Sequence, residues 1–212
     1  MWLTHVGRLA FPIFAFLAVE GYFHTRSFKR YALRMLLFAV LSEVPFDLMY
    51  GGTVFYPVHQ NVIWTLLLGL LGIRLMEAAR AKGKRWLYVL TCAAVVVLGF
   101  ALGTLGMVDY YGAGVLTVFA FYFFRERKWW CLLGQLAALY WLNVVVLGGQ
   151  MYPVTLFGRE IELCEQGLAL LALVPIWLYR GRQGHHSKAF QYACYAFYPA
   201  HMLVLALLTM IQ

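Results

Sequence analysis

Acidic residues are scarce in this chain. Asp and Glu together supply nine of its 212 residues, and all charged residues make up only 12%. In soluble globular domains, charged residues make up about a quarter of all residues, so the composition excludes an ordinary water-soluble domain. Hydrophobic residues instead make up 63% of the chain. That excess is typical of a protein embedded in a lipid bilayer.

Cysteine is also scarce, and its four positions are far apart. Each cysteine stands alone within or at the end of an apolar stretch, which excludes a disulfide framework and a cysteine-based metal site: Cys92, Cys131, Cys164 and Cys194. The His, Asp and Glu residues form no group with metal-ligand spacing and an open position. We therefore expect no metal cofactor.

Long apolar stretches dominate what is present. A helix that spans a bilayer needs about 20 predominantly apolar residues, and eight stretches approach that length. Because no strand, repeat or soluble domain is indicated, the sequence predicts an all-α fold, a polytopic membrane helix bundle in which residues 1–212 form one transmembrane domain. The predicted transmembrane helices cover residues 6–23, 31–49, 60–76, 86–106, 112–124, 129–148, 161–179 and 193–211. The short fifth helix is expected to begin within residues 108–112.

The basic residues alternate along the chain. Fifteen of the 17 Lys and Arg residues lie at every second gap between apolar stretches. Cytoplasmic loops of membrane proteins carry this excess, so the first basic gap, which follows the first helix, puts both chain termini outside the cytoplasm. The net charge of +8 is dispersed over four short loops, which favours contact with anionic lipid headgroups of the bilayer and no nucleic-acid partner. The four groups are Arg26, Lys29, Arg30 and Arg34; Arg74, Arg80, Lys82, Lys84 and Arg85; Arg125, Arg127 and Lys128; and Arg180, Arg182 and Lys188.

Ionisable residues within apolar spans are expensive to insert into a membrane and are functional candidates by default. One layer lies toward the cytoplasmic ends. There, Glu20 and His24 are four positions apart and share a helix face, so the carboxylate can orient the imidazole. That arrangement serves general-base catalysis or ordinary hydrogen bonding, and the sequence leaves both open.

A second layer lies toward the outer ends. Glu43 and Asp47 share a helix face, and two carboxylates there need a counter-charge, for which Arg8 is the natural candidate. A structural salt bridge is the alternative to a functional role. His59 opens the third helix beside two amides, and the last helix adds a tyrosine and a histidine. The remaining polar candidates of this layer and of the last helix are Gln60, Asn61, Asp109, Tyr110, Tyr198 and His201.

Four blocks of this sequence resemble the TraX family, which is named for the membrane acetylase that modifies the N-terminus of conjugative F-pilin. They occur in family order and span nearly the whole chain from the first block to the last. The resemblance implies a bacterial inner-membrane acyltransferase that uses cytoplasmic acetyl-coenzyme A. The blocks are GRLAFPIFAFLAVEGYFHTRSFKRYALRMLLFAVLSEVPFDL, HQNVIWTLLLG, DYYGAGVL followed by FYFFR, and FYPAH.

The resemblance also concerns the start of the chain. Family members usually begin with a further apolar helix that bears an Asp-His-Ile-Gly motif, and residue 1 falls near the link that follows it. We therefore expect this chain to lack that helix. Its presence would also return the N-terminus to the cytoplasm.

Together, these observations predict acyl transfer inside the bundle. The cations Arg26, Lys29, Arg30 and Arg34 would hold the phosphates of coenzyme A. The base would be His24 on the inner side, with Glu20, or His59 or His201 at a deeper or outer site, where Asp47 is a further candidate for a catalytic carboxylate. Acceptor binding is assigned to the outer layer, and the acceptor itself, a peptide, glycan or lipid, is left open. The residues assigned to acceptor binding or its path are Arg8, Glu43, Asp47, Gln60, Asn61, Asp109, Tyr110 and Tyr198.

Two other classes fit parts of the pattern. A transporter would also carry carboxylates and histidines on both sides of a bundle, although no inverted repeat with paired broken helices is evident. A non-catalytic membrane scaffold would bind no coenzyme A. Uptake or proton flux without an acyl donor would indicate the transporter. Tolerance of substitutions would indicate the scaffold, at Arg26, Arg34, His59 and Asp109.

Overall fold

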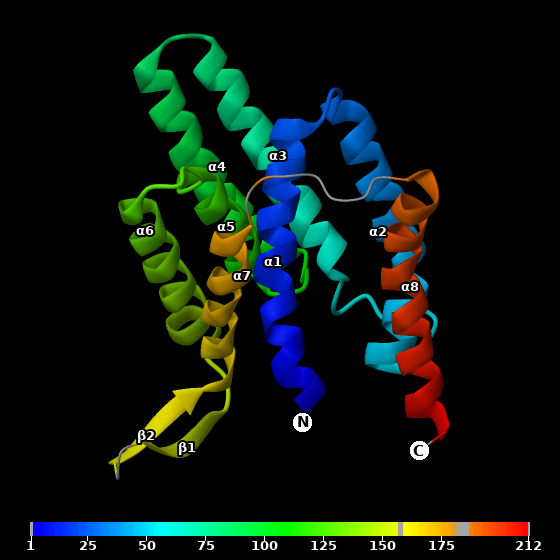
Figure 1. The fold of residues 1–212 in the computed structure, drawn as a ribbon. Helices are drawn as coiled ribbons and strands as arrows, with labels where there is room; N and C mark the ends of the chain where they lie inside the picture. Colours follow the sequence, from blue (N-terminus) through cyan, green and yellow to red (C-terminus); the bar gives the residue numbers. More distant parts are fainter. Residues whose placement is uncertain (1, 157–158, 180, 182–186, 212) are drawn as a thin grey trace.

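A computed structural model describes residues 2–156, 159–179, 181 and 187–211 (Figure 1). Helices account for most of these residues, and one β-hairpin interrupts them. The helical segments in chain order are α1 (Trp2–His24), α2 (Phe28–Gly51), α3 (Val62–Ala81), α4 (Arg85–Leu105), α5 (Tyr111–Phe123), α6 (Trp129–Tyr140) with its π-helical extension η1 (Trp141–Leu147), the 3₁₀ segment η2 (Glu165–Ala172), α7 (Leu173–Leu178) and α8 (Lys188–Ile211).

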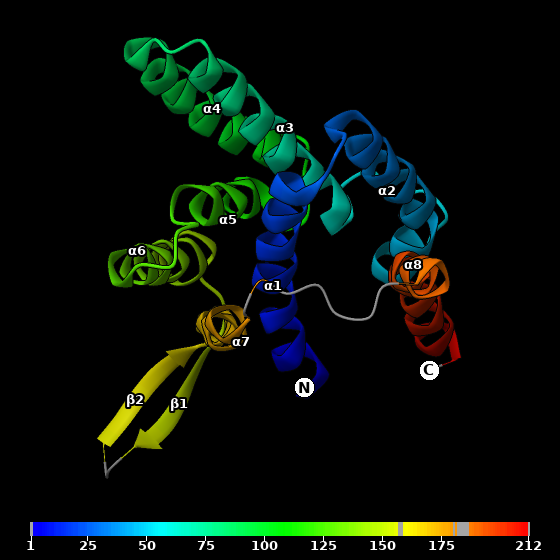
Figure 2. The same ribbon diagram turned by 45° about the horizontal axis from the view of Figure 1, so that its top comes forward.

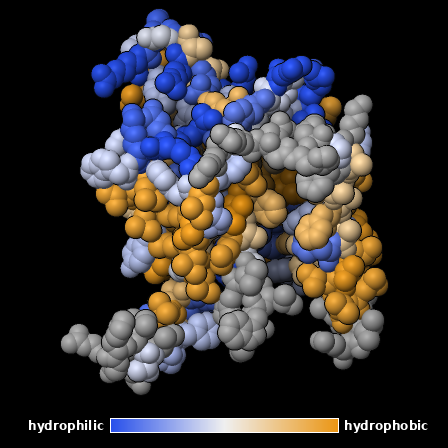
Figure 3. All heavy atoms as spheres, in the orientation of Figure 1, coloured by the Kyte–Doolittle hydropathy of each residue, from blue (hydrophilic) through white to orange (hydrophobic). Residues whose placement is uncertain are grey.

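The helices run up and down, so their links gather at two ends. The links between α1 and α2, α3 and α4, and α5 and α6 lie at one end, and the first and last described residues lie at the other (Figure 1). Hydrophilic side chains cover the first end, and a belt of apolar side chains lies below it (Figure 3). Three of the four basic gaps in the sequence thus lie at one end of the bundle, and Arg180 and Arg182 of the fourth gap lie outside the described residues.

Three helical stretches among the described residues are long and apolar enough to cross a membrane: Val62–Ala81, Arg85–Leu105 and Trp129–Leu147. Such helices satisfy their own backbone hydrogen bonds, which the interior of a bilayer requires. The chain is therefore an all-α membrane protein in class. The larger number of eight crossings and the orientation of the termini remain predictions.

The core lies around α3 and α5. The side chains of α5 from Gly112 to Tyr122 are buried with few exceptions. Small residues of α3 permit the close approach: a Cβ atom added at Gly72 would lie 2.6 Å from Cζ of Phe119, and one at Gly69 would lie 2.7 Å from Cβ of Val118. Glycine at helix contacts is the usual device by which membrane helices pack without a hydrophobic driving force between them.

The β-hairpin was not expected from the sequence. Strands β1 (Met151–Leu156) and β2 (Arg159–Cys164) pair antiparallel, so the prediction of no strand is wrong. The helix predicted over residues 161–179 is present from Glu165 to Leu178, and its first four predicted residues belong to β2 instead. Gly148 and Gly149, both with positive φ, end η1, and Pro153 cannot continue a helix interior. Helical structure resumes only at Glu165, first as a 3₁₀ segment. The Val, Thr and Ile residues of the hairpin also favour strands.

Helix α8 packs along α2, on the side of the bundle away from α6 (Figure 2). The rings of Phe38 and Tyr195 stack between the two helices with centroids 5.0 Å apart. Within the bundle, the α2–α3 link is tied to the α4–α5 link by a short ladder, in which the Gln60 backbone N–H donates to the Met107 carbonyl and the Asp109 N–H to the Gln60 carbonyl, both at 2.9 Å. Two links that are distant in the sequence therefore lie side by side at the end opposite the basic loops, which the predicted topology makes the outer end.

Candidate active site

An outer polar cluster lies where the second half of α2, the start of α3 and the α4–α5 link meet. Asn61 is the N-cap of α3, and its side-chain oxygen accepts from the backbone N–H of Ile63 at 3.0 Å. Its amide group donates to the Ala39 carbonyl at 2.8 Å and to Oε2 of Glu43. Trp64 Nε1 donates to the same carboxylate oxygen at 2.9 Å. The residue that starts α3 thus also fixes a carboxylate of α2.

A buried histidine and a carboxylate form the centre of this cluster. Nε2 of His59 lies 3.4 Å from Oδ1 of Asp109, and His59 is only 7% exposed. The imidazole stacks on the ring of Tyr50 with centroids 4.6 Å apart. Asp109 is itself held, because its Oδ1 accepts from the Tyr110 N–H at 3.1 Å and its carbonyl accepts from Thr65 at 2.6 Å. A carboxylate that orients an imidazole in this way stabilises the imidazolium that forms on proton uptake.

Four buried oxygen atoms in this region have no hydrogen-bond partner among the described residues. They are Ser42 Oγ, Glu43 Oε1, Asp47 Oδ1 and the Tyr198 hydroxyl. The other oxygen of Asp47 accepts from the Tyr56 N–H at 3.0 Å. Tyr198 comes from α8, and its partly buried side chain packs against the core. Buried polar groups are normally paired, so these oxygens are candidates for contact with a bound molecule.

The predicted counter-charge for the two carboxylates of α2 is wrong. Nε of Arg8 lies 3.7 Å from Oε1 of Glu165 at the start of η2, so α1 pairs with the segment that follows the hairpin. The side chain of Gln60 is also turned away from the cluster: its Nε2 donates to the Pro57 carbonyl at 3.1 Å in an exposed position. Its backbone is what joins the two links.

The remaining outer candidates sit beside the cluster. Tyr110 stacks on Phe11 of α1 with centroids 4.1 Å apart, which brings α1 against the α4–α5 link. His201 lies one turn after Phe197 on α8; its Nδ1 is 3.1 Å from the Phe197 carbonyl, and its ring meets that of Tyr198 edge to face at 5.4 Å.

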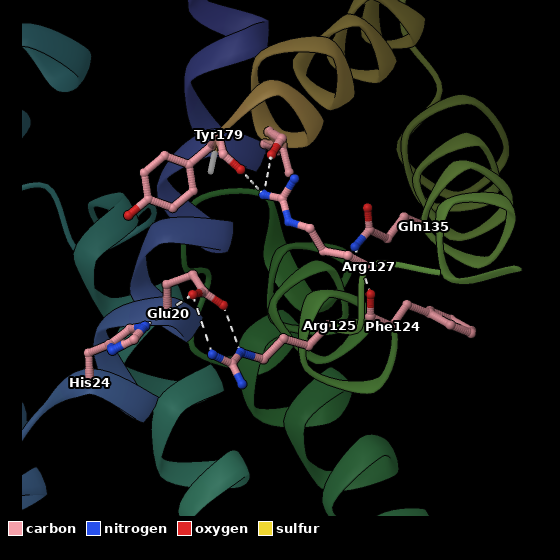
Figure 4. Close-up of polar contacts among 8 residues, drawn as sticks. Glu20, His24, Phe124, Arg125, Arg127, Gln135 and Tyr179 are labelled. Atoms are coloured by element: carbon pink, nitrogen blue, oxygen red, sulfur yellow. Dashed lines mark hydrogen bonds and ion pairs between the residues drawn. The ribbon is translucent and has the colours of Figure 1, made fainter. Parts of the chain in front are cut away.

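At the opposite end, Glu20 lies between two basic groups (Figure 4). Nε2 of His24 is 3.4 Å from Oε2 of Glu20, as the four-residue spacing predicted, but the His24 side chain is 67% exposed. Arg125 approaches the same carboxylate in a two-pronged contact, with Nε to Oε1 at 2.6 Å and Nη2 to Oε2 at 3.3 Å. Glu20 is thus held chiefly by Arg125, a residue that the sequence identified only as a topology charge.

Arg127 has a structural role beside this pair. Its guanidinium donates to the carbonyls of Trp177 at 2.7 Å, of Ile176 at 3.2 Å and of Tyr179, and so caps the C-terminal end of α7 (Figure 4). Unpaired carbonyls at a helix end are stabilised by such cations. Gln135 links the same region by accepting from Trp177 Nε1 at 2.7 Å.

A cavity of about 580 Å³ opens at this basic end of the bundle, between the end of α1, the start of α2 and α3. Two of the four predicted donor-binding cations, Arg26 and Lys29, line it, and Arg74 of α3 joins them. The other two do not: Arg30 is exposed at the surface, and Arg34 lies over the ring of Tyr31 at 6.0 Å. Arg74 is one of the basic residues that the charge pattern assigned to topology alone.

Among the described residues, no group of three or more His, Cys, Asp and Glu side chains could hold a metal ion. The two polar regions are therefore built from one imidazole–carboxylate pair at the outer end and from arginine contacts at the inner end.

Comparison with known proteins gives the chain a family. The model of the TraX protein family matches residues 1–209. The chain is also similar to the probable fimbrial assembly protein FimC, serogroup H1, of Dichelobacter nodosus, with 28% identity over 213 aligned residues that cover 96% of this chain and 81% of the relative. No solved structure matches it. Because the family match extends over nearly all of the sequence, this chain belongs to the TraX family.

Proposed function

We propose that this protein is an integral membrane acyltransferase that moves an acetyl group from cytoplasmic acetyl-coenzyme A to an amine or hydroxyl of a peptide, glycan or lipid. The observation that carries the proposal is the buried His59–Asp109 pair. An imidazole oriented by a carboxylate is the usual general base for activating such an acceptor. Similarity to a protein named for fimbrial assembly favours a pilin-like peptide among these acceptors.

The proposed reaction needs one base and no covalent enzyme intermediate. With its proton on Nε2 and directed to Asp109, the His59 ring keeps a lone pair on Nδ1. That nitrogen takes the proton from the acceptor N–H or O–H as the acceptor atom bonds to the thioester carbonyl carbon. The C–S bond then breaks, and the imidazolium returns the proton to the departing thiolate. Asp109 stabilises the imidazolium between these two transfers.

The free oxygens of Glu43 and Asp47 bear on the choice of acceptor. Two carboxylates without a cation among their described neighbours complement a positively charged group, which favours an amine over a hydroxyl. An amine that arrives as an ammonium must release one proton before it attacks. The second proton follows the path through His59 and leaves with the thiol.

The arrangement in the membrane also supports a donor with a long arm. We place the basic loops in the cytoplasm and the chain in the inner membrane with eight crossings. The cationic cavity and the outer cluster both border α3, at Arg74 and at Asn61. These residues are 13 positions apart, which is about 20 Å along a helix at 1.5 Å per residue. Coenzyme A carries its acyl group at the end of an extended pantetheine arm, and this form of donor suits such a separation.

The test is a histidine panel assayed with labelled acetyl-coenzyme A and a pilin-like peptide in purified membranes. His59→Gln should lower the transfer rate by about 10²–10⁴-fold, the usual contribution of a general base, and Asp109→Asn should also lower it. His24→Gln is the matched control, because its exposed ring also pairs with a carboxylate, and it should retain most of the rate.

If His24→Gln removes transfer and His59→Gln does not, the base lies at the cytoplasmic end and the assignment to His59 is wrong. If none of the substitutions at His24, His59 and His201 changes transfer, or if the wild-type chain transfers nothing but carries protons or solutes across vesicles without a donor, the acyltransferase proposal fails. Protein amounts and helix content, measured for every variant by circular dichroism, separate lost chemistry from lost folding.

A further inference from the structure

The cytoplasmic cavity has a strongly positive lining. Its walls carry three cations, Arg26, Lys29 and Arg74, and one carboxylate, Glu77. That carboxylate is already engaged, because Oε1 of Glu77 accepts from the Tyr122 hydroxyl at 2.6 Å and lies 3.4 Å from Nη1 of Arg80. The three cations therefore face a space in which little negative charge balances them.

These cations also differ from the basic residues of the bundle that are paired with a carboxylate. Arg125 is paired with Glu20, Lys128 with Glu126, and Arg80 with Glu77. In the part of the chain that the structure describes, Arg26, Lys29 and Arg74 have no ion pair, and the one contact found for their charged groups is Arg74 over the ring of Phe28 at 5.9 Å. Three cations from two segments thus converge on one cavity with their hydrogen-bond donors available. Such a group suits an anion with several phosphates.

Apart from Thr25, the rest of the lining is aromatic. Tyr22, Phe23 and Phe28 border the cavity, and Tyr22 meets Phe28 edge to face with ring centroids 5.4 Å apart. Aromatic rings beside cations are the usual combination for holding a nucleotide, because the base stacks on a ring while the phosphates meet the cations. A lipid headgroup would use the cations but would gain little from the rings.

We propose that this cavity binds the adenosine-phosphate head of the acyl donor, with Arg26, Lys29 and Arg74 on its phosphates and Phe28 or a neighbouring ring beneath its base. The inference rests on the proposed function for the identity of the donor. It limits the donor to thioesters that carry a nucleotide, and excludes an acyl group delivered on a carrier protein through a single phosphodiester. Arg74 is thereby assigned as a specificity residue for the donor.

The test uses adenosine 3′,5′-bisphosphate, which has the base and phosphate groups but no thioester. Its binding to the purified chain in nanodiscs of zwitterionic lipid is measured by calorimetry. Arg74→Gln should weaken binding about 10- to 100-fold, as expected for the loss of a charge-assisted phosphate contact. Lys82→Gln is the matched control, since Lys82 is an exposed cation of the next loop and lies outside the cavity. The Lys82→Gln protein should bind the bisphosphate with the affinity of the wild type.

Two further arms separate a nucleotide from a lipid phosphate. Phe28→Leu should weaken bisphosphate binding several-fold and leave the binding of inorganic pyrophosphate unchanged, because only the nucleotide has a base to stack. Nanodiscs with phosphatidylglycerol should compete only weakly with the bisphosphate. Absence of bisphosphate binding, or an equal loss for Arg74→Gln and Lys82→Gln, would overturn the proposal. Full displacement by phosphatidylglycerol would also overturn it and would indicate a lipid site.

The outcome is also separable from that of the proposed reaction. His59→Gln should bind the bisphosphate as the wild type does, because the outer cluster lies at the other end of α3. Binding without any transfer would leave the nucleotide site in place and remove the acyltransferase proposal. If transfer occurs but is unaffected by Arg74→Gln at low donor concentration, the acyltransferase proposal stands and the nucleotide site is removed.

Discussion

Replacing Glu43 with glutamine should stabilise the fold and impair the proposed activity. Oε2 of Glu43 accepts from Asn61 and Trp64, and a glutamine oxygen can keep both bonds. Oε1 is buried without a hydrogen-bond partner among the described residues, and Asp47 lies one turn further along α2 with a free oxygen of its own. The substitution by glutamine would remove one of two neighbouring charges, and the new amide group could donate a hydrogen bond to the carboxylate of Asp47.

The size of the effect follows from Coulomb's law. Side chains four positions apart on a helix lie about 6 Å apart, and two like charges at that distance repel by about 3 kcal/mol at an effective dielectric constant of about 20. Because Glu43 is partly exposed, screening lowers this figure, so we expect Glu43→Gln to raise the free energy of unfolding by about 1–2 kcal/mol. If the carboxylate binds the acceptor amine, transfer should fall in the same variant.

The free energy of unfolding is measured in mixed micelles by titration with dodecyl sulfate and circular dichroism. Glu20→Gln serves as the control of opposite sign, because it removes a charge that is paired with Arg125 and should lower the free energy of unfolding by about 1–3 kcal/mol. The loss of one hydrogen bond costs about 1 kcal/mol. If Glu43→Gln lowers the free energy of unfolding by about that amount or more, the carboxylate has a cationic partner and the reasoning is refuted.

Three further outcomes are expected. Gly72→Leu should lower the free energy of unfolding by about 1–3 kcal/mol, because a Cβ atom added at Gly72 would lie 2.6 Å from the ring of Phe119 in α5. A change below about 0.5 kcal/mol in the same titration would contradict this packing cost. Gln135→Leu removes the acceptor of Trp177 Nε1 and should shift tryptophan fluorescence and cost about 1–3 kcal/mol; an unchanged spectrum would count against this contact. In a chain without native cysteines, a membrane-impermeant maleimide should label Lys84→Cys only from the cytoplasmic side and Gln150→Cys only from the outer side of intact cells or inverted vesicles; labelling of both from one side would refute the predicted topology.

Much of the outer site could be anticipated from the sequence. His59, Asn61 and Asp109 were candidates because polar residues at membrane depth are costly unless they are used. The structure brings the three into one cluster, and it leaves the hydroxyl of Tyr198, on α8, buried without a hydrogen-bond partner among the described residues. The pairing of Arg8 was wrong, since charge balance says that a cation is needed but not which helix supplies it. The sequence also did not single out Arg74 as part of the cavity. Basic residues next to a cytoplasmic loop are common in membrane proteins because they set the topology, so charge alone does not show which of them line a cavity.

The hairpin shows a different limit. Residues 151–164 follow an apolar span and precede another apolar run, so hydropathy alone favoured a helix across the second strand. Two glycines with positive φ and Pro153 decide against it locally. Neighbouring β-branched residues then form strands that pair with each other. Apolar content fixes where a chain is buried in a membrane, but the backbone preferences of a few residues fix its secondary structure.

The sequence by itself determined the class of protein, the approximate helices, the basic and non-basic ends of the bundle and the family resemblance. These properties are local or additive, because the length of an apolar stretch and the charge of a loop do not depend on distant residues. The tertiary structure decided which side chains meet. His59 and Asp109 are 50 positions apart, and Glu20 and Arg125 are 105 apart. Their contacts depend on how each helix is rotated and packed, which is set by close approaches such as that of Gly72 to Phe119.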